Sequence, residues 1–244
     1  MTTEIHPSAH VDPDADIGDD VTIGPNVVIE QDVALGDGCR IGPGAVIHQY
    51  TTMGPRCRVH AHAVLGDLPQ DLAFEDKKTF LEIGSDSVFR EGVTVHRGTK
   101  EGSKTTIGNH CFLMAYSHVG HNCEIGNHVI LVNNVMLAGY VIVGDNVFFG
   151  GGSGIHQFVQ IGRLAMIGGN SSVSQDFPPF CTAAPAHLNR LLGLNTVGLR
   201  RAGLSPDDRL NLKKALPLIF KSNLNREETA ERLKSEFPEG PVHE

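Results

Sequence analysis

The stretch IGNHCFLMAYSHVGHNCEIGNHVILVNNVMLAGYVIVGDNVFFGGGSGIHQFVQIGRLAMIGGNSSV, residues 107–173, decides the fold of this 244-residue chain. A branched or bulky apolar residue returns at every sixth position: Ile107, Leu113, Val119, Ile125, Leu131, Leu137, Val143, Phe149, Ile155, Ile161, Ile167 and Val173. A period of six fits neither an isolated helix nor a hairpin sheet. It is typical of a chain that turns a corner every six residues and closes a triangular coil every eighteen. The pattern therefore predicts a parallel β-helix.

Coils of this length place residues that are eighteen positions apart above one another, at the sheet spacing of ~4.8 Å. His121, Gly139, Gln157 and Gln175 form one such column. An imidazole is thus predicted beside a residue that has no side chain, which leaves backbone exposed next to the ring, and near a carboxamide. We expect this column to hold the functional site.

The same period begins at Val11 and is broken by two segments, 66–82 and 97–106. The first contains a proline and mixed charge, and the second is rich in Gly, Lys and Thr. Both are predicted to loop out of the coil, and loops on a rigid scaffold often carry binding residues. Pro178 and Pro179 cannot continue a strand, so we expect the coil to end before them.

A helical region is predicted to follow the coil. Ser205–Asp208 offers an N-cap, a proline at the first helical position and acidic first-turn residues. Asn225 and Glu228 offer a capping box for a second helix. We expect two domains, a β-helix at 1–186 and a helical domain at 187–244 that covers the open end of the coil.

Composition is ordinary for a folded globular protein, with 20% charged and 40% hydrophobic residues. Residues 1–186 carry 20 Asp and Glu against 10 Lys and Arg, whereas residues 187–244 carry 8 against 10. A basic tail on an acidic body suggests a dock for an acidic partner or a phosphate. The basic cluster is Arg200, Arg201, Lys213 and Lys214.

The N-terminus shows no secretion signal, and no stretch reaches the ~18 apolar residues of a membrane span. We therefore expect a cytoplasmic protein without stable membrane insertion. The five cysteines are an odd number, and without a secretion signal free thiols are expected.

The sequence contains no serine-nucleophile motif, P-loop or dinucleotide fingerprint, so covalent catalysis and nucleotide hydrolysis have no support. No histidine stands eighteen residues after His118 or His121, so no vertical pair of metal ligands is expected within one chain. We predict neither a metal nor a cofactor. His121 lies at a polar corner, where a neutral imidazole can take a proton from an alcohol at pH 7.

Several stretches carry a family resemblance. They are GDLPQDLAF (66–74), SHVGHNCEIGNHVILVNNVMLAGY (117–140), HQFVQIG (156–162) and GLNTVGLRRAGLS (193–205). In this order and spacing the chain resembles the UDP-N-acetylglucosamine 3-O-acyltransferase family, which opens lipid A biosynthesis. The similarity runs from about Ile5 to Asn223 and includes both loops.

The resemblance implies a left-handed β-helix, an exception to the usual right-handed crossover, and a homotrimer with active sites between subunits. It also implies acyl carrier protein and UDP-N-acetylglucosamine as partners, and no nucleic acid. By the family's pattern, His121 is the general base that deprotonates the sugar 3-hydroxyl. That oxygen then attacks the acyl thioester, and the Gly139 N–H holds the developing oxyanion.

Other positions match the family's pattern residue by residue. The resemblance implies a substrate-binding set and one position, Gly169, that measures acyl length. The substrate-binding set is Asp71, His118, Tyr140, His156, Gln157, Asn195 and Arg201. Three positions depart from the pattern: Asn122 replaces an Asp, Ala73 a Lys, and Tyr140 a His on the sugar side.

Two alternatives stay open. A related hexapeptide transferase could acylate an amine on a sugar nucleotide, as in a 3-amino sugar or the later N-acyl step of the same pathway. A β-helix of this kind could also be non-catalytic or resemble carbonic anhydrase.

Overall fold

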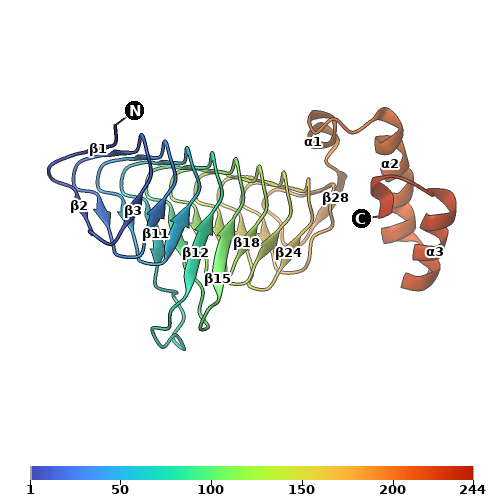
Figure 1. The fold of residues 1–244 in the computed structure, drawn as a ribbon. Coiled ribbons are helices and arrows are strands. Elements are labelled where there is room, and N and C mark those ends of the chain that lie inside the picture. Colours follow the sequence, from blue (N-terminus) through green and yellow to red (C-terminus); the bar gives the residue numbers. More distant parts are fainter. Residues whose placement is uncertain (1, 244) are drawn as a thin grey trace.

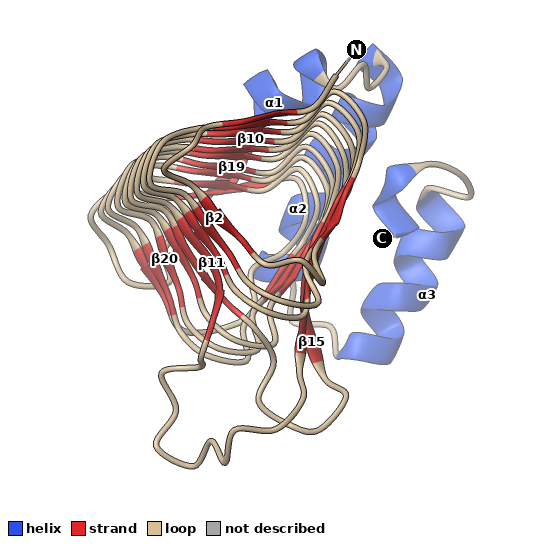
Figure 2. Ribbon diagram, turned by 60° about the vertical axis from the view of Figure 1, so that its left-hand side comes forward, coloured by secondary structure: helices blue, strands red, loops and turns tan. Residues whose placement is uncertain are grey.

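The structure is a computed structural model that describes residues 2–243. Three parallel sheets wrap around one axis as the faces of a triangular coil, which is seen end-on in Figure 2 and from the side in Figure 1. From β1 to β26 the chain visits the three sheets in turn, so the strands that pair are three places apart in the sequence. The predicted parallel β-helix is confirmed.

Most strands have two residues, because the chain turns a corner after each one. Sheet A contains β1 (Glu4–Ile5), β4 (Thr22–Ile23), β7 (Arg40–Ile41), β10 (Arg58–Val59), β13 (Val88–Phe89), β16 (Phe112–Leu113), β19 (Ile130–Leu131), β22 (Phe148–Phe149), β25 (Met166–Ile167), β27 (Cys181–Ala183) and β28 (Leu191–Leu194). Sheet B contains β2 (His10–Val11), β5 (Val28–Ile29), β8 (Val46–Ile47), β11 (Val64–Asp67), β14 (Thr94–His96), β17 (His118–Val119), β20 (Met136–Leu137), β23 (Gly154–Ile155) and β26 (Ser172–Val173). Sheet C contains β3 (Asp16–Ile17), β6 (Ala34–Leu35), β9 (Thr51–Met53), β12 (Phe80–Ile83), β15 (Lys104–Ile107), β18 (Glu124–Ile125), β21 (Ile142–Val143) and β24 (Gln160–Ile161).

The apolar residue of each hexad points into the coil. Leu113, Val119 and Leu137 are at most 1% exposed, and all twelve hexad positions of residues 107–173 belong to one core cluster. Each corner ends on a residue with positive φ, for example Asn122 (58°) and Asn134 (59°). Asn and Gly adopt this left-handed conformation most readily, which accounts for their frequency at the corners.

The two predicted loops leave the same corner of the coil (Figures 1 and 2). The first connects β11 to β12 through residues 68–79, and the second connects β14 to β15 through residues 97–103. The strands before and after each insertion still pair as in the rest of the coil. Arg58 in β10, for example, pairs with Val88 in β13, although the first loop lies between them in the sequence. The ends of the predicted segments 66–82 and 97–106 belong to the flanking strands, so both loops are shorter than predicted.

The coil runs further than predicted. β27 pairs in parallel with β25 after the proline pair, and β28 then pairs antiparallel with β27. Within two residues of the proline pair the chain re-enters the coil, because Cys181 and Ala183 pack into its core. The predicted boundary at 186 and 187 stays a prediction, although strand pairing continues beyond it to Leu194.

Three α-helices and a 3₁₀ turn cover the C-terminal end of the coil (Figure 1). They are α1 (Thr196–Arg201), α2 (Pro206–Lys221), α3 (Arg226–Glu236) and the turn at Pro241–His243. Both predicted caps are present: Ser205 accepts from the Asp208 N–H, and Asn225 forms the capping box with Glu228. A small second core joins the helices to the coil end, with Leu199 and Leu212 packed near Phe180.

No helix within residues 2–243 is both long enough and apolar enough to cross a bilayer. The five cysteines are buried and carry free thiols.

Candidate active site

A cavity of about 930 Å³ lies on the outer face of sheet B. Its floor comes from the outward-facing positions of β14, β17, β20, β23 and β26, and its rim from the corners that follow these strands. The lining residues are Gln70, Thr94, His96, Tyr116, His118, Gly120, His121, Met136, Leu137, Ala138, Gly139, Gly154, Ile155, His156, Gln157, Ser172, Val173, Ser174 and Leu188. Five predicted site residues meet here: His118, His121, Gly139, His156 and Gln157.

The predicted column of His121 over Gly139 is present. Its register is fixed by backbone bonds, since the Tyr140 N–H donates to His121 O at 2.9 Å. A methyl group on Gly139 would lie 2.4 Å from His121 Cε1 and 2.6 Å from Nε2. Only glycine therefore fits at 139, and the Nε2 edge of the ring faces its backbone. Among the described residues, the Gly139 N–H has no acceptor.

Asn122 determines the tautomer of His121. Asn122 Oδ1 accepts from the Thr99 N–H at 3.1 Å and from Thr99 Oγ1 at 2.8 Å, which identifies this atom as the amide oxygen. The same oxygen lies 3.1 Å from His121 Nδ1. Because an amide oxygen only accepts, the proton belongs on Nδ1. Nε2 is left with its lone pair, on the side of Gly139, as a general base requires.

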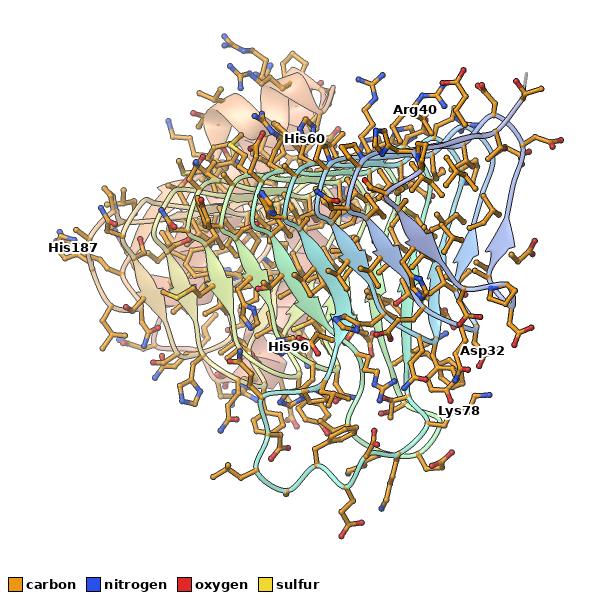
Figure 3. All side chains as sticks on the ribbon, turned by 90° about the vertical axis from the view of Figure 1, so that its left-hand side faces the viewer. Asp32, Arg40, His60, Lys78, His96 and His187 are labelled. Carbon is orange, nitrogen blue, oxygen red and sulfur yellow. The ribbon has the colours of Figure 1, made fainter. Side chains whose placement is uncertain are left out.

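Two further histidines line the floor. His118 Nδ1 lies 2.8 Å from Thr94 Oγ1, and the rings of His96 and His118 meet edge to face, with centroids 4.8 Å apart. Figure 3 shows His96 at the end of its strand, where the chain leaves the coil. Burial, and to a smaller extent the neighbouring His118, lowers the pKa of His96 to about 4. Burial, and then the charge of His121, also lowers the pKa of His118. Both rings are therefore neutral at pH 7, and they add no positive charge beside His121.

A second cavity, of about 670 Å³, lies against sheet A and helix α1. It holds the two predicted residues of the tail, Asn195 and Arg201. Asn195 also has a structural role, because its Oδ1 caps α1 at the Gly198 N–H and its Nδ2 donates to Leu164 O. The two cavities share no lining residue. Within one chain the predicted site residues are therefore divided between two cavities, one with His121 and one with Asn195 and Arg201.

The described residues contain no set of side chains arranged to bind a metal ion. Over residues 2–243, no three His, Cys, Asp or Glu side chains are grouped so that they could hold an ion.

Comparison with known proteins agrees with this architecture. Residues 176–244 match the family described as UDP N-acetylglucosamine O-acyltransferase, domain 2. Residues 2–31, 32–67 and 104–139 match the bacterial transferase hexapeptide, and residues 140–175 match the hexapeptide repeat of succinyl-transferase.

The acyl-(acyl-carrier-protein)–UDP-N-acetylglucosamine O-acyltransferase of Alkalilimnicola ehrlichii is 45% identical over 98% of this chain and 93% of its own length. This chain belongs to that acyltransferase family. The LpxA structure from Acinetobacter baumannii matches with a TM-score of 0.90 and 39% identity, over 95% of this chain and 90% of that one. The LpxA of Bacteroides fragilis matches with a TM-score of 0.93 and 35% identity, over 98% and 93%. The predicted left-handed β-helix with a helical C-terminal part is confirmed.

Tyr140, where the acyltransferase family has a histidine, supports His121 from the side. Its hydroxyl lies 2.9 Å from Thr99 Oγ1. Its ring meets the His121 ring edge to face at 5.3 Å and stacks on Phe158 at 5.1 Å. Tyr140 is not part of the cavity lining, so its contact with a substrate stays a prediction.

Two other predicted residues of this acyltransferase lie outside both cavities. Asp71 caps its own turn, since its Oδ1 accepts from the Ala73 N–H at 2.9 Å, while its neighbour Gln70 reaches the cavity. Gly169 lies at the corner between sheets A and B, close to Gly151 O. Their roles toward sugar and acyl chain remain predictions.

Sequence reasoning missed His96 and Thr94. The expectation that no second histidine forms a vertical pair of metal ligands with His118 or His121 considered only a separation of eighteen residues. The preceding coil contains the second loop, so Thr94 pairs with His118 at a separation of twenty-four. The sequence does contain a signal for this contact, because His96 stands immediately before the segment that interrupts the hexads.

Proposed function

We propose that this protein transfers an acyl chain, a 3-hydroxyacyl chain by the resemblance, from acyl carrier protein to the 3-hydroxyl of UDP-N-acetylglucosamine. This would be the first step of lipid A biosynthesis, in the cytoplasm. The observation that carries the proposal is the His121 ring at the rim of the cavity, fixed by Asn122 with Nε2 free and packed beside Gly139, whose N–H has no acceptor among the described residues.

The reaction that these groups support is a general-base acyl transfer. His121 Nε2 takes the proton of the sugar hydroxyl while that oxygen bonds to the thioester carbonyl carbon. The Gly139 N–H donates to the oxygen that becomes negative, where a fixed donor is most effective. The C–S bond then breaks, and the leaving thiolate takes the proton back from the imidazolium. An ester and a free thiol result, and no cofactor is needed.

We also infer a homotrimer whose sites each combine two subunits. The first cavity carries His121 and the second carries Arg201, on different faces of one chain. A threefold ring places one face of each subunit against a different face of the next, which can join the two cavities. Three exposed apolar side chains suit burial in such an interface. They are Met136 (55% exposed), Phe158 (62%) and Leu188 (64%).

The test is to incubate the purified protein with UDP-N-acetylglucosamine and a set of acyl carrier proteins that bear different chains, and to follow the products by mass spectrometry. The proposal expects an ester on the sugar, with one chain length preferred. The 3-amino analogue of the sugar is run in parallel. Faster transfer to the amine than to the hydroxyl would favour the N-acyl alternative, and absence of transfer to either would reject the proposal.

A further inference from the structure

Arg97 is a buried cation at the base of the first loop. It directly follows His96 at the end of β14, and it is 1% exposed, the largest of the fully buried side chains. Removing a charge from water costs several kcal/mol, even after relaxation of the protein around it. A guanidinium in this place therefore needs a reason beyond filling space.

The partners of Arg97 lie both in the segment 68–79 that connects β11 to β12 and in the coil. Its Nη2 lies 3.2 Å from Asp76 Oδ1, and its backbone N–H donates to Asp67 O at 3.1 Å. The guanidinium carbon lies 5.9 Å from the ring centroid of Phe74 and 5.4 Å from that of Tyr50. Cations are attracted to aromatic rings at such distances, more strongly when water is excluded. Arg97 thus joins the coil, through Tyr50, to the loop.

Little else holds the tip of this loop. The hydrogen bonds, ion pairs and ring contacts that link residues 70–76 to the rest of the described chain all go to Arg97. The remaining polar contacts are local, such as the Phe74 N–H to Asp71 O and the Lys77–Glu75 pair. Leu72 is fully exposed. The position of the tip therefore depends on one buried side chain.

The loop tip brings Gln70 to the cavity. His96, the last residue of β14, lines that cavity, and Arg97, the first residue after the strand, contacts the loop tip. Two adjacent residues therefore shape the floor of the cavity and the loop at its edge. The end of the loop is held separately, because Lys78 O accepts from the Gly102 N–H at 2.9 Å and Lys78 Nζ lies 4.8 Å from the ring centroid of Tyr50. We propose that Arg97 is a positioning residue, which holds the tip of the loop, residues 70–76, at the cavity so that Gln70 and Asp71 meet the sugar nucleotide. The sugar's identity rests on the proposed function, whereas the anchoring of the loop does not.

The experiment compares Arg97→Met and Asp76→Asn with Asp20→Asn. The control removes the same kind of pair at the same separation, because Arg40 Nη2 lies 3.2 Å from Asp20 Oδ2 near the N-terminal end of the coil. Methionine keeps much of the length of arginine without the charge. Replacing a buried ion pair by apolar groups is often neutral or stabilising, and removing one partner is costly only where the other charge stays buried. Asp76 is 78% exposed, so its carboxylate stays in water when Arg97 is replaced. We therefore expect the Tm of Arg97→Met to be no lower than that of the wild type.

Two measurements then report on the position of the loop: the rate of tryptic cleavage and the KM for the sugar nucleotide. Trypsin should cut after Lys77 and Lys78 faster in Arg97→Met than in the wild type, with Asp76→Asn between them and Asp20→Asn unchanged. KM for UDP-N-acetylglucosamine should rise about tenfold with kcat within about twofold, as expected when an interaction that binds ground state and transition state equally is lost.

Three results would overturn the proposal. Unchanged cleavage would show that Arg97 does not hold the loop. Faster cleavage with an unchanged KM would show that the loop does not position the sugar. A fall in Tm and kcat at constant KM would make Arg97 a folding residue only. A wild-type protein that transfers no acyl group would defeat the proposed function, while cleavage and Tm would still decide the anchoring.

Discussion

One amide oxygen, Asn122 Oδ1, sets the chemistry of the His121 ring. It accepts from Thr99 and faces His121 Nδ1, so the base is aimed by a neutral group instead of by the carboxylate that the family resemblance led us to expect. A neutral partner fixes the tautomer but adds less stabilisation to the imidazolium than a carboxylate does. The Tyr140 hydroxyl, bonded to Thr99, completes a chain of uncharged groups behind the ring.

The first prediction concerns His121→Ala. Loss of a general base costs about 10²- to 10⁴-fold in turnover. The side chain lies at a corner outside the apolar core, so the Tm should stay within a few degrees of the wild type. Steady-state kinetics and thermal unfolding on the same samples check this. A variant with most of its activity would reject His121 as the base, and a large loss of Tm would give the ring a structural role.

His96 and His118 make the stability of the fold depend on pH. Their pKa values are lowered in the folded protein, that of His96 to about 4, because burial disfavours the charged form. The unfolded chain therefore binds more protons as the pH falls below ~6.5, and the free energy of unfolding decreases until about pH 4. The shift at His96 corresponds to about 3 kcal/mol.

Urea unfolding at a fixed protein concentration, from pH 7.5 to 4.5, tests this sign. We expect the wild type to lose more stability across the range than His96→Gln. His10→Gln, which changes an exposed histidine, should follow the wild type. Equal losses for the wild type and His96→Gln would contradict the burial argument.

Helix α2 carries the exposed basic pair that the charge pattern singled out. Lys213 and Lys214 follow the buried Leu212, so they point away from the small core beneath the helix. Arg201, by contrast, lines the second cavity. The basic cluster therefore divides into a cavity part and a surface part.

We predict that Lys213→Gln combined with Lys214→Gln raises KM for the acyl carrier protein, leaves KM for the sugar nucleotide unchanged and weakens the salt dependence of the rate. Rim charges act on encounter more than on the chemical step. Lys234→Gln, which removes a surface charge on α3, is the control and should leave the KM for the carrier protein unchanged. A defect that persists at saturating carrier protein, or kinetics identical to the wild type, would remove the pair from the docking surface.

The sequence predicted the coil well because one residue in six repeats the same physical requirement. The inward residues, the left-handed corners and the His121 column all follow from that period. The loops do not repeat, so nothing periodic predicts their path. The edge-to-face contact of His96 with His118 and the contacts of Arg97 with the loop depend on insertions that shift the eighteen-residue count.

The molecule as a whole presents one proposed site in two parts. An acidic coil carries His121, the proposed general base, and the more basic end carries Arg201, the last residue of α1. Period and composition could not predict this separation, because it depends on which corner of the triangle each residue occupies. In the proposed trimer, a neighbouring subunit brings the two parts together, so the proposed chemistry depends on the assembly.

Subunit complementation between His121→Ala and Arg201→Ala tests this shared site most directly. Each variant alone should have low activity, since each lacks one part in every site. Unfolding and refolding the two together in equal amounts should give mixed trimers in which about a quarter of the interfaces join an intact His121 to an intact Arg201. Activity should then rise toward about a quarter of the wild-type value. Activity no higher than the average of the two separate variants, in trimers shown to be mixed, would contradict a site built from two subunits.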